Sequence, residues 1–383
     1  MTTSPTAQTT DVAIVGGGVI GLAVAHALAR RGRAVVVIEA ARIGERAAAG
    51  VAAGMLAPSS EADLSDPRLT TFALASQALY AAWAANLEAE SGVDTGYDTT
   101  GTLMVALHHD HLALIEHLHA FQLERGLAAE RLTARQAREE EPYLAPGIAG
   151  ALRMPDAQVD PRRLLRALTV AIERAGGSIL EDTRVTGVIA DSTSGYDITI
   201  EHDGAPSMLH ATQVVIAAGA WSRQIESPLP PLPMRPVKGQ ILRLRGERLA
   251  RHVIRTPDVY LVPRADGELV IGGTMEEMGF DARSTAGAVH DLLREARRAL
   301  PGIAELELVE CGVGFRPALR DHLPAIGCAD GAGLFVASGH FRDGVELAPI
   351  TAQLLADLIC DARLDPLLAP FTPDRFAHVE VTR

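Results

Sequence analysis

The sequence predicts an α/β fold that combines a discontinuous Rossmann-like domain with an α+β domain built on a large antiparallel sheet. Three observations support this prediction. A glycine-rich turn joins a buried strand to a helix near the N-terminus. Similar strand and helix patterns return more than about 100 residues later, as in doubly wound α/β folds. Between them lie a helical stretch and a run of alternating strands.

The length of the chain also favours two domains. It has 383 residues, and single cores stop growing at roughly 250–300 residues. We expect the first domain to comprise residues 1–85, 150–222 and 306–383, and the second to comprise residues 86–149 and 223–305.

The composition argues against several classes of protein. The net charge is −13, and no cluster of Lys and Arg with interleaved aromatic residues occurs, so we expect no nucleic acid or anionic membrane as a partner. Three cysteines without a CxxC pair argue against disulfides or a zinc site and fit the cytoplasm. The uncharged residues 12–29 include three consecutive glycines, and the N-terminus lacks basic residues. We therefore expect neither a membrane span nor an export signal.

The first motif has the pattern of a dinucleotide-binding unit. A short buried strand leads into GxGxxG at Gly16, Gly18 and Gly21, and a helix and a second strand follow. Gly16 permits the tight turn, Gly18 lets the backbone approach a pyrophosphate, and Gly21 lets the helix pack on the strand. The helix N-terminus offers N–H groups to the phosphates. Glu39 follows the last glycine at close to the spacing of roughly 20 residues that is expected for an acid that binds a ribose hydroxyl. An acid at this position disfavours NADP and leaves FAD and NAD open.

Later segments predict further elements of the same layer. Asp160 and Pro161 are typical of a helix start, and apolar residues then repeat at helical spacing. The predicted elements are a helix over 161–175, one strand over 178–189, buried strands over 211–219 and 333–338, and a helix over about 344–360.

A hairpin in the second domain can be read closely. Asp266-Gly267 predicts a two-residue turn. That turn would place Tyr260 opposite Gly273, with Met275 on the same face and within diagonal reach. This arrangement leaves room for a small molecule, and ordinary core packing is the alternative.

Two arginines stand among apolar residues in "VGFRPALRD". Arg316 and Arg320 suit an acidic substrate because arginine binds carboxylates through two parallel hydrogen bonds. A structural ion pair with Asp321 is the alternative. Five histidines lie within residues 108–119, but none are four apart, so we expect no metal site. GxSxG, HExxH and P-loop motifs do not occur, so a cofactor should carry any chemistry.

These motifs together resemble the D-amino-acid oxidase-like FAD enzymes. The similarity covers about residues 10–360 and includes "AAGMLAP", "VKGQ", "YLVPR…GELVIGGTM", "GFRP" and "GHFRDGVELAP", in that order. Within that family the chain is most similar to the glycine oxidases of bacterial thiamine biosynthesis. The resemblance implies non-covalent FAD and oxidative deamination of glycine and other small amines to the 2-oxo acid. Hydride would pass to flavin N5, with O₂ as acceptor and hydrogen peroxide as product.

The resemblance also assigns roles to residues. Arg316 would hold the substrate carboxylate, Tyr260 would help it, and Met275 would line the pocket. Arg342 would lie beside substrate and flavin. The residues expected to bind FAD are Gly16, Gly18, Val19, Ile20, Gly21, Glu39, Ala40, Ala48, Ala49, Ala53, Gly54, Met55, Val185, Gly219, Gly339, His340, Phe341, Arg342, Asp343, Gly344, Val345 and Glu346.

The sequence departs from its relatives at three places. Ala48-Ala49 replaces residues that usually carry hydroxyl groups, and Asp343 stands where Asn is common. Cys311 is near, but does not match, the position at which some relatives attach the flavin, so we expect no covalent link. The turn after residue 338 should face the flavin ring, with the helix from about residue 344 directing N–H groups at it.

Several alternatives stay open on the sequence alone. These are a sarcosine or D-amino-acid oxidase or dehydrogenase, and a flavin subunit of a membrane-linked hydrogen cyanide synthase-type complex. An aromatic hydroxylase with the same N-terminal motif is disfavoured, because "GHFRDG" stands where we would expect a "GDAAH"-type stretch. The resemblance further implies a cytoplasmic homo-oligomer, either a tetramer or a dimer.

Overall fold

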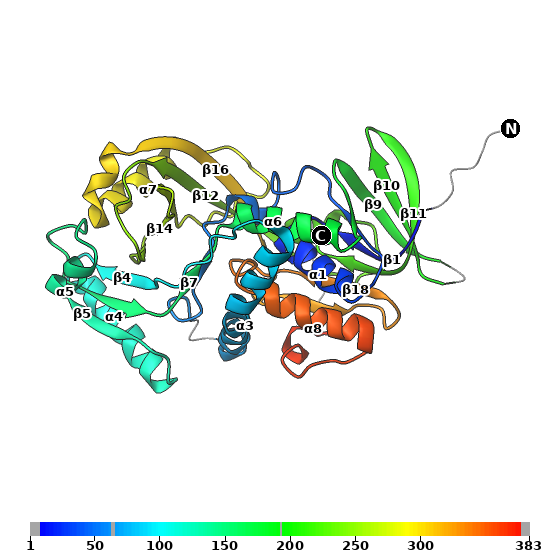
Figure 1. The fold of residues 1–383 in the computed structure, drawn as a ribbon, viewed down its shortest axis with the longest axis horizontal. Helices are drawn as coiled ribbons and strands as arrows, with labels where there is room; N and C mark the ends of the chain where they lie inside the picture. The colour runs from blue at the N-terminus through cyan, green and yellow to red at the C-terminus, as the bar shows by residue number, and fades with distance from the viewer. Residues whose placement is uncertain (1–7, 63–65, 192–193, 377–383) are drawn as a thin grey trace.

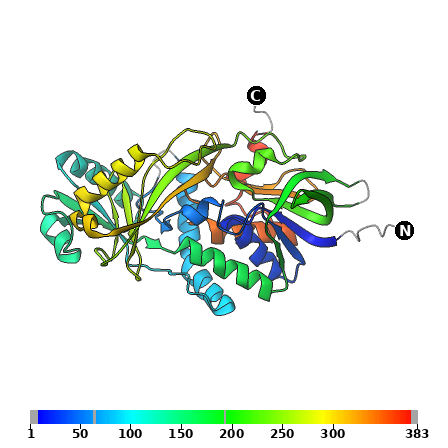
Figure 2. The same cartoon turned by 90° about the horizontal axis from the view of Figure 1, so that it is seen from above.

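The structure is a computed structural model that describes residues 8–62, 66–191 and 194–376 (Figure 1). Two eight-stranded sheets occupy opposite ends of an elongated molecule, as seen in both views (Figure 1, Figure 2). This arrangement confirms the predicted combination of a Rossmann-like layer and a sheet-based second layer. Within the described residues, the helices are all too short or too polar to cross a bilayer.

The first sheet is mainly parallel and follows the predicted doubly wound pattern. Its strand order is β17-β18-β11-β1-β2-β8, with β10 and β9 added antiparallel beside β11. The strands are β1 (Gln8–Val15), β2 (Val35–Ile38), β8 (Ser178–Leu180), β9 (Thr183–Ala190), β10 (Tyr196–His202), β11 (Ala205–Ile216), β17 (Ala325–Cys328) and β18 (Leu334–Ser338).

Alternate residues of β1 pack on opposite sides of this sheet. Val12 and Ile14 join the core formed with the helices, whereas Ala13 and Val15 join the core formed with β9 and β10. The helices on the first side, which pack against one another, are α1 (Val19–Ala29), α3 (Pro67–Ser91), α6 (Pro161–Arg174) and α8 (Ala348–Asp361). The predicted start of α6 is confirmed, since Asp160 accepts hydrogen bonds from two backbone N–H groups of its first turn.

The second sheet is antiparallel apart from one parallel pair, β13 with β4. Its order is β16-β12-β15-β14-β13-β4-β6-β5. The strands are β4 (Thr102–Ala106), β5 (Glu130–Thr133), β6 (Gly150–Met154), β12 (Arg235–Arg245), β13 (Val253–Arg255), β14 (Tyr260–Pro263), β15 (Glu268–Gly272) and β16 (Glu307–Ala318). The helices beside it are α4 (His109–Glu124), α5 (Ala134–Glu140) and α7 (Ala286–Ala299).

The remaining elements are short. They are α2 (Ala48–Val51), the strand pair β3 (Met55–Leu56) and β7 (Ala157–Gln158), and the 3₁₀ turns η1 (Gly219–Gln224), η2 (Pro301–Glu305), η3 (Ala369–Phe371) and η4 (Pro373–Phe376).

Two strands lie in a different layer from the one that the predicted boundaries imply. The boundaries at 150 and 306 assigned β6 and β16 to the first domain. However, β6 pairs with β4 and β5, and β16 pairs with β12, all within the antiparallel sheet. We therefore propose boundaries after these strands, at about residues 155 and 319, and the division into two domains stays a prediction.

Three local predictions are wrong in detail. The strand expected over 178–189 is two strands, because Asp182 adopts a left-handed conformation between them (φ 50°). The helix expected from residue 344 begins at Ala348, because residues 344–347 form turns.

The third error is in the β14–β15 hairpin. It closes with a three-residue loop in which Gly267 supplies the left-handed position (φ 85°). Tyr260 therefore pairs with Gly272 and not with Gly273.

Candidate active site

One cavity of about 600 Å³ runs between the two layers. The elements that line it include the β1–α1 turn, the end of β2, α2, β9, η1, β12, β14, β16 and the turn after β18. The cavity thus joins the expected nucleotide site to the expected substrate site.

The glycines of the first motif have different surroundings. A Cβ on Gly16 would lie 2.6 Å from the carbonyl oxygen of Ala217, and one on Gly21 would lie 2.0 Å from that of Gly16. A Cβ on Gly18 would meet no protein atom within 4 Å. Gly16 and Gly21 therefore permit close packing of the chain, whereas Gly18 leaves an open space at the N-terminus of α1, where no side chain caps the helix.

Glu39 completes the nucleotide end. Its two carboxylate oxygens accept hydrogen bonds from the backbone N–H groups of Gly17 (2.7 Å) and Ala41 (3.2 Å). Burial raises the pKa of Glu39, and these N–H groups partly offset that rise. The side chain is therefore fixed at the end of β2, as an acceptor for a ribose hydroxyl requires.

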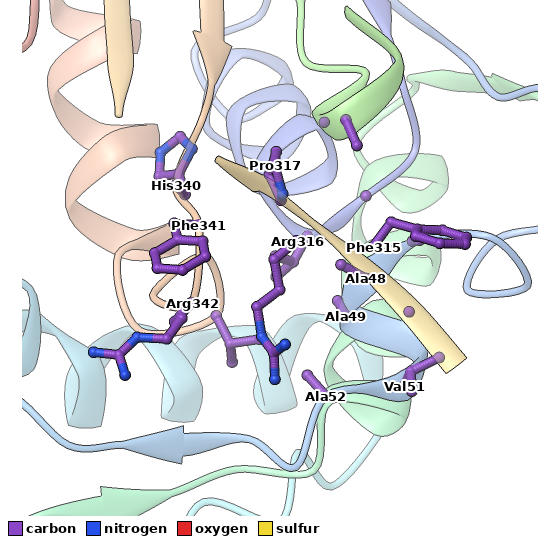
Figure 3. Close-up of a pocket in the computed structure, with 18 of the residues that line it drawn as sticks. Ala48, Ala49, Val51, Ala52, Phe315, Arg316, Pro317, His340, Phe341 and Arg342 are labelled. Carbon is purple, nitrogen blue, oxygen red and sulfur yellow. The ribbon is translucent and has the colours of Figure 1, made fainter. Parts of the chain in front are cut away.

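Arg316 is held at the far end of the cavity by the backbone around it. Its side chain extends from β16 across β12, where a Cβ on Gly239 would lie 2.3 Å from its Nη1. Nη1 donates a hydrogen bond to the carbonyl oxygen of Thr274 (3.0 Å). Both Arg316 and Arg342 line the cavity, and Figure 3 shows their side chains extending in different directions, from β16 and from the turn after β18.

Tyr260 faces the same region. Its hydroxyl would lie 2.4 Å from a Cβ on Gly272, so the ring lies over that bare glycine. Burial raises the pKa of Tyr260, although Arg316 opposes the rise. The phenol is therefore neutral at physiological pH and can donate a hydrogen bond.

Glu61 links two arginines at this end. Its oxygens lie 3.1 Å from Nη1 of Arg255 and 3.7 Å from Nη2 of Arg342. Burial alone would raise the pKa of Glu61, but the charges of Arg255, Arg342 and Arg316 together hold it below its ordinary value. One carboxylate thus stands among three guanidinium groups that line the cavity, which leaves this end suited to an anion.

The turn after β18 is fixed to β16. The N–H of Phe341 donates to the carbonyl oxygen of Pro317 (3.0 Å), and Phe341 has a left-handed backbone (φ 49°). His340 contacts α8, where its Nε2 lies 3.1 Å from the hydroxyl of Thr351 (Figure 3). Because the helix starts only at Ala348, turn residues rather than a helix N-terminus face the cavity.

A buried glutamate lies behind this turn. Burial raises the pKa of Glu346 well above its ordinary value, and the negative charges of Asp343, Glu61 and Asp156 raise it further. Its Oε1 is buried without a hydrogen-bond partner. The surroundings of Glu346 on the cavity wall therefore favour its protonated form.

Almost all residues expected at the site line this one cavity. The exceptions are Gly21, which packs α1 on β1, and Gly339, where a Cβ would lie 2.4 Å from Leu319 Cδ1. The residues brought together are Gly16, Gly18, Val19, Ile20, Glu39, Ala40, Ala48, Ala49, Ala53, Gly54, Met55, Val185, Gly219, Tyr260, Met275, Arg316, His340, Phe341, Arg342, Asp343, Gly344, Val345 and Glu346.

The sequence reasoning missed Glu61 and Arg255. Glu61 lies on the turn after β3, and Arg255 ends β13 opposite Tyr260. A charged residue at the end of a buried apolar strand was the available signal for Arg255. The other arginine that was considered, Arg320, is exposed and does not line the cavity.

Other predicted features lie elsewhere. Cys311 is exposed on β16 and is not among the residues that line the cavity. Among the described residues, acids, histidines and cysteines do not gather into a group that could hold a metal ion.

The residues present fit a flavin dinucleotide. The open space at Gly18, the uncapped start of α1 and the fixed carboxylate of Glu39 suit its pyrophosphate and ribose. Ala48 and Ala49 supply no hydroxyl groups there, so α2 can contact the cofactor only through backbone groups and methyl groups.

The comparisons with known proteins agree with this geometry. The model of the FAD dependent oxidoreductase family matches residues 11–358. The glycine oxidase of Geobacillus kaustophilus is 37% identical over 371 residues, covering 95% of this chain and 97% of that protein. Its crystal structure superposes with a TM-score of 0.89, at 36% identity, over 97% of this chain and 100% of that chain.

Two further relatives are named for other functions. The bifunctional protein ThiO/ThiG of Trichormus variabilis is 36% identical over 376 residues, which cover 96% of this chain but 55% of that protein. The chain therefore spans about half the length of this relative. The hydrogen cyanide synthase subunit HcnC of Pseudomonas aeruginosa is 30% identical over 406 residues, covering 96% of this chain and 97% of that protein. With its matching fold and cavity, the chain belongs to the FAD-dependent oxidoreductase family.

Proposed function

We propose that the protein oxidises glycine and other small amines to the 2-oxo acid, which is glyoxylate in the case of glycine. The amino acid, O₂ and water would give the 2-oxo acid, ammonia and hydrogen peroxide. The observation that carries this proposal is the fixed guanidinium of Arg316, which faces the cavity beside Tyr260 while the nucleotide motif lies at the other end. A glycine oxidase among the relatives supports the choice of substrate.

The residues of the chain would act mainly by binding and orientation. Arg316 would hold the carboxylate through charge-assisted hydrogen bonds, and the neutral phenol of Tyr260 would donate a further one. FAD, when bound, supplies the two-electron acceptor for the α-carbon. The positive charges of Arg255, Arg316 and Arg342 would also disfavour a further positive charge on the substrate. They would therefore favour the neutral form of the substrate amine. We expect the rate to rise with pH as that amine loses its proton.

We also propose a role in the thiazole branch of thiamine biosynthesis, because a bifunctional ThiO/ThiG protein is among the relatives. Such an enzyme would work in the cytoplasm, with FAD bound non-covalently, as a tetramer or dimer. Light scattering on the purified protein would test the oligomeric state. Acid precipitation followed by absorbance of the supernatant would test the non-covalent link, since free FAD would be released.

The proposed reaction can be tested on the purified protein. We expect a flavin absorbance spectrum and peroxide formation in air with glycine, and smaller rates with sarcosine, D-alanine and D-proline. Absence of flavin would overturn the whole assignment. Peroxide formation with D-proline or sarcosine but not with glycine would show that the enzyme is a sarcosine or D-amino-acid oxidase, the nearest alternative within the family.

A second candidate is a flavin subunit that passes electrons to another acceptor. The relative named as a hydrogen cyanide synthase subunit supports it. Glycine-dependent reduction of a dye without air, together with no peroxide in air, would favour this candidate over an oxidase.

A further inference from the structure

The "VKGQ" motif on β12 presents alternate residues to opposite sides of the strand, as β-structure requires. Gly239 lines the cavity, and the guanidinium of Arg316 lies directly over it, 2.3 Å from where a Cβ would stand. The neighbouring side chains of Lys238 and Gln240 point to the other side, which α7 covers. Both are buried, although neither contributes to the cavity wall.

Lys238 is a buried charge with few partners. Its side chain is 1% exposed, its Nζ donates to the carbonyl oxygen of Arg283 (2.7 Å), and Glu276 lies 3.8 Å away. An ammonium group removed from water is destabilising unless it is paired or hydrogen-bonded. Both of these side-chain contacts lie in one segment, residues 273–285, which we call the rim loop.

Gln240 holds the same loop at two points. Its Nε2 donates to Oε1 of Glu276 (2.7 Å), and its Oε1 accepts from the backbone N–H of Thr285 (2.9 Å). The backbone of Lys238 also exchanges two hydrogen bonds with that of Glu276, both 3.0 Å. These hydrogen bonds hold the rim loop to β12 at Glu276 and at Thr285, near its two ends.

The rim loop has two other contacts with the body of the protein: Phe280 packs against Trp221 and Phe315, and Glu277 pairs with Arg235 (3.1 Å). Met275, Met278 and Phe280 expose 58%, 55% and 40% of their surface. Yet the loop carries the Thr274 carbonyl that accepts from Arg316, and Met275 lines the cavity. The position of this acceptor therefore depends on what holds the loop.

We propose that Lys238 and Gln240 are positioning residues for Arg316. They fix the rim loop so that the Thr274 carbonyl holds the guanidinium flat across Gly239, ready for a carboxylate. This inference rests on the proposed role of Arg316 as the carboxylate anchor. Three residues of the motif then act on Arg316. Gly239 provides the space for its guanidinium, and Lys238 and Gln240 fix the loop that carries its hydrogen-bond acceptor, the Thr274 carbonyl.

The test uses the FAD-loaded enzyme and acetate, a carboxylate that cannot be oxidised. Acetate binding is titrated through the change in flavin absorbance, and Tm and FAD affinity are measured alongside. We expect Lys238→Met and Gln240→Met each to weaken acetate binding by about 10- to 100-fold, the range for a misplaced charged hydrogen bond. FAD affinity should stay unchanged. Gln240→Met keeps the test valid if the lysine variant does not fold.

Arg243→Met is the matched control. Arg243 lies on the same strand, is 2% exposed, and pairs with Glu268 (2.8 Å) away from the rim loop. We expect it to lower Tm while leaving acetate affinity as in the wild type. Equal loss of acetate affinity in this variant would show a general stability effect and overturn the proposal.

Two further outcomes separate this inference from the proposed function. If Arg316→Ala loses acetate binding but Lys238→Met and Gln240→Met keep it, the positioning role is wrong and the anchor stands. If the flavin-loaded wild type neither binds acetate nor oxidises glycine, the proposed function fails, and this inference fails with it.

Discussion

The two ends of the cavity are built in different ways. At the nucleotide end, the site expected for the cofactor is formed largely by glycines and backbone groups of the β1–α1–β2 segment, and even Glu39 is fixed by N–H groups of Gly17 and Ala41. At the substrate end, charged side chains come from four separate segments: Glu61, Arg255, Arg316 and Arg342. Local geometry thus determines the first end, and tertiary packing determines the second.

This difference affects how each end should respond to substitution. A glycine at the nucleotide end either packs against the chain or leaves space for a ligand, so its replacement acts sterically. A charge at the substrate end is balanced by other charges, so its removal leaves a partner uncompensated.

The largest effect should come from Arg316→Ala. Loss of one partner of a desolvated charge pair costs roughly 2–5 kcal/mol, which is about 30- to several-thousand-fold in kcat/KM. FAD binding should be retained, because Arg316 is remote from the nucleotide motif. Steady-state kinetics with glycine and the flavin spectrum measure both quantities.

Arg320→Ala is the control for this prediction. Arg320 is an exposed arginine four residues along and outside the cavity, and its loss should leave kcat/KM unchanged. Comparable rates in Arg316→Ala and Arg320→Ala would refute the anchor.

The next prediction separates two glycines of the nucleotide end. Gly21→Ala should lower the Tm of the cofactor-free protein, because its Cβ would lie 2.0 Å from the backbone oxygen of Gly16. Gly18→Ala meets no protein atom within 4 Å, so the cofactor-free Tm should be unchanged. It should instead weaken FAD binding by about tenfold or more, equivalent to about 1.4 kcal/mol, because the new methyl group occupies space meant for the pyrophosphate. Wild-type FAD affinity in Gly18→Ala would show that the phosphates bind elsewhere.

The same contrast explains what the sequence could predict. The β1–α1–β2 unit was predicted correctly because its signals are local: a buried strand, spaced glycines and an acid at the end of the next strand. The predicted register of the β14–β15 hairpin is wrong by one residue, since Asp266-Gly267 fits both a two-residue turn and the three-residue loop that the structure has. The start of α8 was placed four residues early, because Gly344 marks a turn that precedes the helix.

Glu61 and Arg255 were missed for a different reason. No local pattern links a glutamate after β3 to an arginine in β13, and only the fold brings their side chains to 3.1 Å. Most of the remaining site residues were predicted from the family resemblance. Spacing alone leaves open whether Tyr260 and Met275 line a pocket or pack in the core.

The pair of Glu61 and Arg255 should contribute to stability. Both side chains are 15% exposed, and Glu61→Gln would leave the guanidinium with weaker partners. We expect a loss of about 1–3 kcal/mol in the free energy of unfolding at pH 7, the cost of an incompletely satisfied buried group. Because the folded-state pKa of Glu61 is lowered, this contribution is present above the ordinary glutamate pKa and is lost as pH falls through the lowered one. Denaturant unfolding at pH 7 and at pH 4 measures the difference.

Glu310→Gln is the exposed counterpart. Glu310 pairs with Arg162 at 2.6 Å, with side chains 34% and 42% exposed, and such surface pairs contribute about 0–1 kcal/mol. An equal loss of unfolding free energy in Glu61→Gln and Glu310→Gln would mean that the pair of Glu61 and Arg255 contributes no more to stability than a surface pair.

The smallest effect concerns Glu39 and Glu346, one glutamate at each end of the cavity. The pKa of both is raised mainly by burial, but Glu39 accepts two backbone hydrogen bonds whereas Oε1 of Glu346 has no partner. Glu346→Gln replaces a neutral acid by a neutral amide of similar shape. Because the folded-state pKa of Glu346 is raised, the wild type loses stability as pH rises from the ordinary glutamate pKa toward the raised one. The variant should match the wild type near the ordinary glutamate pKa and exceed it increasingly as pH rises above that value. Unfolding free energies across this range test it, with Glu305→Gln showing what the loss of one exposed carboxylate does by itself. A constant difference between wild type and Glu346→Gln at all pH values would show that the pKa of Glu346 is the same in the folded and unfolded protein, and so is not raised by its surroundings.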